Sequence, residues 1–86
     1  MTLKLRAGVS TADTDYGTTL LDEDSGEYFT LNPSAALVLR TLLGGGTAAE
    51  AARALTAEYA VDTDTADRDV ADLMAELRSA GLVTEP

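Results

Sequence analysis

The sequence contains no cysteine and no histidine. This absence excludes disulfide bonds, a thiol nucleophile, a zinc site of the usual kind and any catalytic pair that needs an imidazole base. Tryptophan is also missing and there is one phenylalanine, so a core must rely on leucine, valine and alanine. Fifteen carboxylates remain, but so small a core implies no pocket for an acid–base pair. We therefore expect neither a cofactor nor an enzyme.

Positive charge and long apolar runs are also scarce. The formal net charge is −9, and six basic side chains are scattered along the chain: Lys4, Arg6, Arg40, Arg53, Arg68 and Arg78. Phosphate backbones repel such a surface, so we expect no nucleic-acid partner. The longest apolar stretch, 35–39, is too short to span a bilayer, and the N-terminal residues lack the apolar core of a secretory signal. We expect a cytoplasmic protein without a membrane partner.

The first third of the chain has the pattern of three short strands. Alternating apolar positions occur in 3–14, a β-prone run covers 18–22, and a third run covers 27–31. Turn signals separate them, DYG at 15–17 and DSG at 24–26. Strands joined by turns this short form an antiparallel meander.

The rest of the chain is predicted to be helical. An asparagine N-cap and a proline at the first helical position open a helix over 33–43, which ends at three glycines. The letters TAAE at 47–50 form a capping box for a second helix that continues to about Tyr59. A third helix is predicted from about 65 to 80 by its apolar stripe, with Gly81 as its C-cap. The expected fold is α+β: an N-terminal three-stranded antiparallel sheet followed by three helices, in a single domain over 1–86.

The outer edge of the third strand has little protection. A free edge exposes unpaired N–H and C=O groups, which proteins usually block with proline, lysine or a bulge. The letters EYFTL at 27–31 include none of these and carry one charge, Glu27. The edge is therefore either poorly protected or open to β-augmentation, in which a partner peptide adds as a further strand.

Three segments together resemble a known family: EYFTLNPSAALVL at 27–39, TAAEAARALTAEYAVD at 47–62 and DRDVADLMAELRSAGLV at 67–83. Their order and spacing are similar to the PqqD-like recognition elements of pathways for ribosomally made, modified peptides (RiPPs). The chain looks most like the stand-alone leader-binding proteins of lasso-peptide biosynthesis. The resemblance covers about 9–83 and implies a winged-helix-like fold. It also implies that the leader of a precursor peptide binds as a fourth strand, in a groove between the third strand and the third helix.

The resemblance assigns leader-binding roles to residues of these two elements. On the strand, the backbone partners of the leader are Glu27, Tyr28, Phe29, Thr30 and Leu31. On the helix, an apolar wall and an acidic rim are implied: Val70, Leu73, Met74 and Leu77, then Asp69, Asp72 and Glu76.

Within these sets, side-chain direction can also be predicted. The resemblance implies that Phe29 and Leu31 face the helices and that Tyr28 and Thr30 point away. Because side chains alternate along a strand, a shift of one residue in register would exchange the two pairs. We expect Met74 in the groove, since a flexible thioether adapts to a guest. Leu73 and Leu77 are expected to be pure core.

Plainer interpretations of the same residues stay open. An apolar helical stripe is more often ordinary core, and an acidic flank is more often a solvated face. A winged-helix DNA-binding protein shares the architecture, but its recognition helix should be basic, and this one carries four acids. A carrier protein is also small and acidic, but it needs a serine at a helix start, and Ser25 falls in a turn.

The function that the resemblance implies is that of a non-catalytic adaptor, expected to be monomeric. It would bind the leader and deliver it to a cysteine leader peptidase and an ATP-dependent macrolactam cyclase. The recognition element of another RiPP pathway is the alternative.

Overall fold

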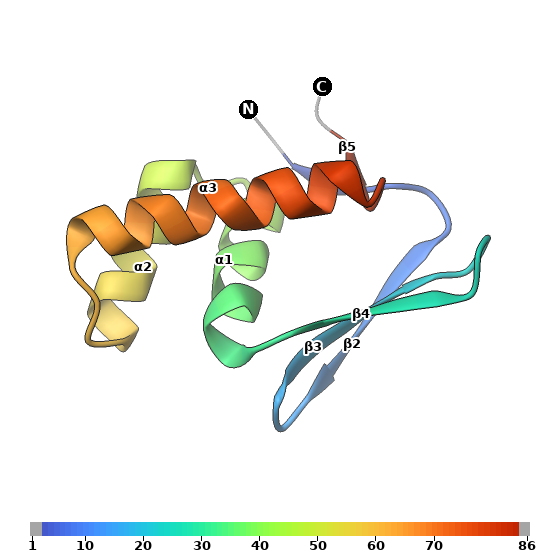
Figure 1. Cartoon of the computed structure of the whole chain (residues 1–86), viewed down its shortest axis with the longest axis horizontal. Coiled ribbons are helices and arrows are strands. Elements are labelled where there is room, and N and C mark those ends of the chain that lie inside the picture. The colour runs from blue at the N-terminus through green and yellow to red at the C-terminus, as the bar shows by residue number, and fades with distance from the viewer. Residues whose placement is uncertain (1–2, 85–86) are drawn as a thin grey trace.

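The computed structural model describes residues 3–84, in which most strands precede the helices (Figure 1). In chain order the elements are β1 (Lys4–Leu5), β2 (Val9–Thr14), β3 (Gly17–Asp22), β4 (Glu27–Leu31), α1 (Pro33–Leu43), α2 (Ala48–Glu58), α3 (Thr63–Ser79) and β5 (Val83–Thr84). Strands β2, β3 and β4 form a three-stranded antiparallel sheet in that order. The predicted α+β, winged-helix-like architecture is confirmed.

Both predicted turns join neighbouring strands of this sheet. Thr14 pairs with Gly17 across the turn at 15–16, and Asp22 pairs with Glu27 across the loop at 23–26. Gly17 has a φ of +136°, and a Cβ there would collide with the Leu31 carbonyl oxygen. The glycine therefore permits the close approach between the start of β3 and the end of β4.

The strand-like run predicted over 3–14 is divided in the structure. The chain turns at Gly8, whose φ of +89° lies in the left-handed region that favours glycine. The part before this turn, β1, leaves the meander and pairs with β5 in a separate two-stranded sheet. Figure 1 shows these two short strands side by side near the C-terminal end of α3. Leu82 and Val83 are buried there.

The first two helices begin where their capping residues indicate. The Asn32 side chain accepts a hydrogen bond from the Ala35 N–H at 2.9 Å. Thr47 and Glu50 form the predicted capping box, with reciprocal bonds of 3.1 and 2.9 Å. Local side-chain chemistry therefore sets both starts.

The third helix begins at Thr63, two residues before the predicted start at 65. Its N-cap is Asp62, whose carboxylate accepts a hydrogen bond from the Thr65 N–H at 2.7 Å. Gly81 follows the helix with a φ of +71°, which turns the chain toward β5.

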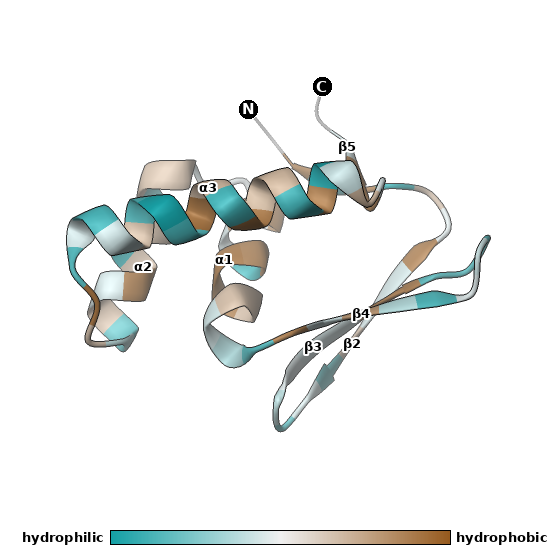
Figure 2. Cartoon of the chain, in the orientation of Figure 1, coloured by the Kyte–Doolittle hydropathy of each residue, from teal (hydrophilic) through white to brown (hydrophobic). Residues whose placement is uncertain are grey.

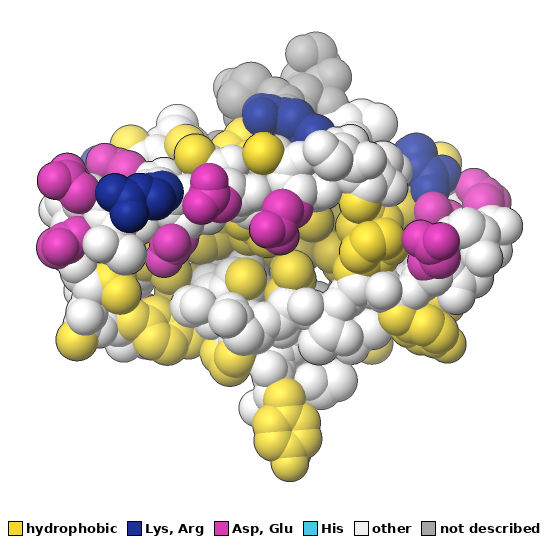
Figure 3. Space-filling model, viewed as in Figure 1, with side chains coloured by type: hydrophobic (Ala, Val, Ile, Leu, Met, Phe, Trp, Pro, Cys, Tyr) yellow, Lys and Arg dark blue, Asp and Glu magenta, His cyan; other side chains and the backbone are white. Residues whose placement is uncertain are grey.

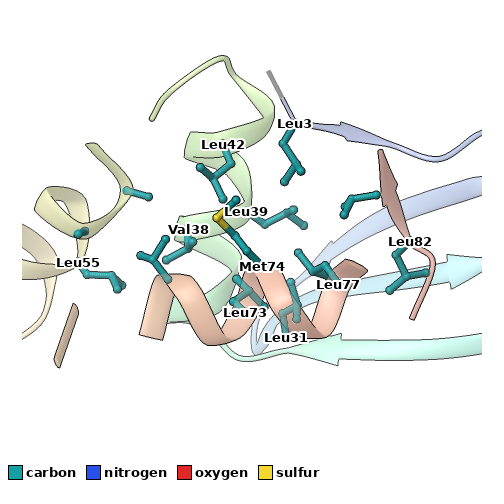
Figure 4. Packing of buried hydrophobic residues seen from close by; sticks show 14 of the residues in the cluster. Leu3, Leu31, Val38, Leu39, Leu42, Leu55, Leu73, Met74, Leu77 and Leu82 are labelled. Carbon is teal, nitrogen blue, oxygen red and sulfur yellow. The ribbon is translucent and has the colours of Figure 1, made fainter. Parts of the chain in front are cut away.

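The hydrophobic core lies between the helices and the inner face of the sheet (Figure 4). Its largest fully buried side chains are Leu20, Leu39, Leu82, Val38 and Val70. The α3 ribbon alternates between hydrophilic and hydrophobic turns, as expected for a helix with one buried face (Figure 2). Within residues 3–84, none of the helices combines the length and the apolar character needed to cross a bilayer.

Candidate functional site

Strand β4 forms one edge of its sheet. Its residues pair with β3 from Glu27, opposite Asp22, to Leu31, opposite Thr18. Among the described residues, no strand pairs with the other side of β4. The outer edge that the sequence leaves unprotected is therefore open in the structure, and it presents main-chain donors and acceptors for another extended chain.

Side chains of β4 alternate as the sequence predicts. Leu31 is buried in the core and Phe29 is half-buried against it. Tyr28 is 70% exposed and Thr30 is exposed, on the opposite face of the strand. The strand thus combines an open edge with an inner apolar side.

A groove of about 760 Å³ lies between β4 and the C-terminal half of α3. The strand contributes Tyr28 to Leu31, and the helix contributes Leu73, Glu76 and Leu77. Apolar side chains are visible in the hollow below the acidic row of α3 in Figure 3. The volume is in the range of sites that take several side chains of a ligand.

Residues that the sequence analysis did not assign form part of this groove. Ser79 and Ala80 extend its helical wall, and Leu82 lines it as well. Ala80 lies seven positions after Leu73, so helical periodicity places both on one face and is the signal that identifies it.

A second hollow of about 260 Å³ adjoins the groove, because Leu73 and Glu76 line both. Its other walls come from the N-terminal turn of α1 and from Leu55 of α2. Asp69 and Asp72 stand here beside Glu76. The three acids that the resemblance assigns to the rim are therefore brought together, at the end of the groove nearest α1.

Val70 and Met74 lie elsewhere. They are buried to 2% and 8% exposure and line a different hollow, with Ala48 and Ala49 of α2. Figure 4 shows the Met74 side chain extending toward Leu39 of α1. The expected position of Met74 in the groove is wrong.

The geometry of an α-helix explains this correction. Met74 is one residue, or about 100°, from Leu73 around the helix axis, while Leu73 and Leu77 lie almost in line. The row containing Leu73 and Leu77 therefore faces β4, and the row containing Met74 faces α1 and α2. Leu73 and Leu77, expected as pure core, are buried and also line the groove.

The site offers a shaped apolar surface and main-chain hydrogen-bonding groups. Between residues 3 and 84, no three His, Cys, Asp or Glu side chains come together in a way that could hold a metal ion. An open strand edge, an apolar groove and an adjoining acidic hollow suit an extended polypeptide with apolar and basic side chains. Fold and site together define a small winged-helix-like peptide-recognition domain.

Comparisons with known proteins identify the family. Residues 17–83 match the model of coenzyme PQQ synthesis protein D (PqqD). The chain belongs to the PqqD family. No curated protein matches the chain significantly.

Two solved structures are similar to this one. A lasso peptide synthetase B1 complexed with the leader peptide is 44% identical, with a TM-score of 0.91 over 99% of this chain and 100% of that chain. TbiB1 in complex with the TbiA(beta) leader peptide is 30% identical, with a TM-score of 0.84 over 96% of each chain. These matches confirm the PqqD-like RiPP recognition element that the sequence resembles. In both solved structures the similar protein is bound to a leader peptide.

Proposed function

We propose that this protein binds the leader of a ribosomally made precursor peptide as an added strand along β4, within one recognition domain over 1–86. The unpaired outer edge of β4, beside a groove of about 760 Å³, is the observation that carries the proposal. Two similar solved structures, at 44% and 30% identity, each hold a leader peptide.

Strand addition uses the backbone for affinity and the groove for selection. The leader main chain would pair with Glu27 to Leu31, and every second leader side chain would point toward α3. Those side chains would contact Phe29 on the strand, with Leu73 and Leu77 on the helix. Such contacts must outweigh the ordering of a flexible leader. We expect a dissociation constant of about micromolar or tighter, roughly −8 kcal/mol or better.

The acidic hollow places negative charge at one end of the groove. Asp69, Asp72 and Glu76 would attract basic leader side chains at the end where β4 runs into α1. The aliphatic stems of these basic leader side chains would lie against Leu73 and Leu55. The same acidic surface of α3 argues against the DNA-binding alternative.

The adaptor would act by raising effective concentration. A bound leader brings its attached core peptide to the maturation enzymes, so a bimolecular encounter becomes a reaction within one complex. The enzymes proposed are a cysteine leader peptidase and an ATP-dependent macrolactam cyclase. The adaptor, proposed to act as a monomer, supplies no reacting group.

The proposal is tested by titrating fluorescein-labelled leaders of precursor peptides encoded near this gene and measuring anisotropy. Hydrogen exchange on the same complexes should show new protection at the β4 edge. A saturable complex without added protection in 27–31 would refute strand addition. Binding of leaders only from other modified-peptide classes would favour the alternative pathway assignment.

A further inference from the structure

Arg6, in the turn between β1 and β2, bonds to two distant segments of the chain and to its own neighbour Ala7. Its Nε donates to the Gly81 carbonyl at 2.6 Å. Nη2 forms an ion pair with Asp22 at 2.8 Å, and Nη1 forms one with Asp24 at 3.0 Å. Nη1 also donates to the Ala7 carbonyl at 3.0 Å. The planar guanidinium can satisfy several acceptors at once because its donors point in fixed, divergent directions.

These partners lie next to the two walls of the groove and do not line it. Asp22 ends β3 opposite the first residue of β4, and Asp24 lies in the loop that joins the two strands. Gly81 follows the C-terminal end of α3. Arg6 therefore ties the β3–β4 end of the sheet to the residues that follow α3.

Backbone hydrogen bonds run parallel to this side-chain bridge. The Arg6 N–H donates to the Leu82 carbonyl at 2.9 Å, and the Glu23 N–H donates to the Gly8 carbonyl at 2.8 Å. A Cβ on Gly8 would lie 3.1 Å from a carboxylate oxygen of Asp24, so the glycine leaves room for the ion pair. The turn at 6–8 thus contacts both the β3–β4 loop and the residues after α3.

The opposite end of the groove is held by the chain itself. Strand β4 runs through Asn32 directly into α1, and α1 packs against α3 in the core. At the other end, the 6–8 turn and its bridge connect the β3–β4 loop to the residues after α3.

An exposed ion pair usually contributes little to stability. This one differs because the Asp22 side chain is 13% exposed and the Arg6 side chain 32% exposed, and because Arg6 has several partners at once. A lysine could keep the charge but could not reproduce the divergent set of hydrogen bonds.

We infer that Arg6 is a positioning residue for the peptide groove, which holds β4 and α3 at the spacing that selects the side chains of the bound peptide. The spacing itself is a property of the free protein. The identity of the occupant rests on the proposed function. Without the bridge, the β3–β4 loop gains freedom, the groove widens, and its discrimination between side chains of different size declines.

The spacing can be measured without any ligand. Because the chain has no cysteine, nitroxide labels can be placed at Glu23→Cys, in the β3–β4 loop, and at Ala71→Cys, an exposed position on α3. Pulsed electron–electron double resonance should give a narrow distribution of the distance between the two labels in the parent protein. Arg6→Gln and Arg6→Lys should each broaden it about twofold. The control Arg53→Gln, which removes the same charge from an exposed position on α2, should not change it.

A second measurement separates positioning from general destabilisation. The probes are a fluorescein-labelled leader that binds the parent and the same leader with one groove-facing leucine replaced by tryptophan. The parent should prefer the original leader, and Arg6→Lys should reduce this preference at least threefold. Equal weakening of both peptides would overturn the positioning role.

The distance measurement and the binding comparison together distinguish a failure of the Arg6 inference from a failure of the proposed function. An unchanged distance distribution in Arg6→Lys overturns the inference even if Arg6→Gln does not fold. If no leader binds the parent, the proposed function fails, and the distance measurement alone decides whether Arg6 sets the groove.

Discussion

At the scale of single residues, Phe29 is a half-buried aromatic side chain of β4 that also lines the groove. It is half-buried against the core from one side and contributes to the groove from the other. We predict that Phe29→Ala weakens leader binding at least tenfold, because an aromatic anchor in a groove carries a large share of binding energy. The loss of stability should be smaller than the roughly 3–5 kcal/mol of a fully buried phenylalanine.

Tyr16→Ala is the matched control for this prediction. Tyr16 is an aromatic residue that is 83% exposed at the β2–β3 turn, outside the residues that line the groove. Anisotropy titrations should give the same affinity for Tyr16→Ala as for the parent. A Phe29→Ala variant that binds as tightly as Tyr16→Ala would show that the groove beside β4 does not receive the leader.

A sequence pattern predicts the position of a single residue only when it also identifies the element that the residue contacts. Alternation along β4 correctly places Phe29 and Leu31 on one face and Tyr28 and Thr30 on the other, because a strand has only two faces. The stripe on α3 predicts burial, but it does not say which side of the stripe meets β4 and which meets α2, so Met74 is misplaced. Arg6 could not be assigned at all, because its partners lie 18 and 75 positions away along the chain.

At the scale of elements, the helix starts are set by local chemistry. We predict that Thr47→Ala lowers the free energy of unfolding by about 1 kcal/mol, because it removes the hydroxyl acceptor of the capping box at the start of α2. Urea unfolding followed by circular dichroism measures this change. Thr56→Ala is the control, since the Thr56 hydroxyl bonds only to the Arg53 carbonyl within the same helix. Equal losses in the two variants would contradict a capping role.

The same distinction between local and distant partners explains which elements the sequence predicts. The extents of α1 and α2 and the β3–β4 hairpin follow from caps and turn residues a few positions apart. The pairing of β1 with β5 joins the two ends of the described chain and has no local signal. The groove is intermediate: its strand and its helix are predictable separately, but their spacing is set by tertiary contacts such as those of Arg6.

At the scale of the whole molecule, acid should remove stabilising interactions of several carboxylates. Burial by itself would raise the pKa of Asp22, but hydrogen bonds from Arg6 and from backbone N–H groups outweigh it and hold the pKa below its usual value. The Thr47 N–H lowers the pKa of Glu50, and the Thr65 N–H lowers that of Asp62. Each group is therefore more readily ionised in the folded state than in the unfolded state.

The sign of the pH effect follows from linkage. A lowered folded pKa gives stability that is present above the unfolded pKa, about 4 for these groups, and is lost as the pH falls through the folded value. Acid also neutralises a net charge of −9 and so relieves repulsion. The effect of one carboxylate must therefore be measured as the difference in free energy of unfolding between a variant and the parent.

We predict that Asp22→Asn lowers the free energy of unfolding at pH 6 and that its difference from the parent shrinks toward pH 3 in urea titrations. A difference that is independent of pH would exclude an ionised Asp22 as the stabilising form.

The protein has a net charge of −9, and part of this charge lies at the acidic hollow beside the groove. Leader affinity should fall moderately between 50 and 300 mM salt, because charges at an open hollow are screened. The double variant Asp69→Lys/Asp72→Lys reverses charge at the acidic hollow and should weaken binding of a lysine-bearing leader and reverse its salt dependence. The control Asp15→Lys/Glu58→Lys makes the same change in net charge at exposed positions outside the groove and the hollow. If both double variants lose affinity equally, the attraction comes from net charge alone, and the acidic hollow has no specific part in leader recognition.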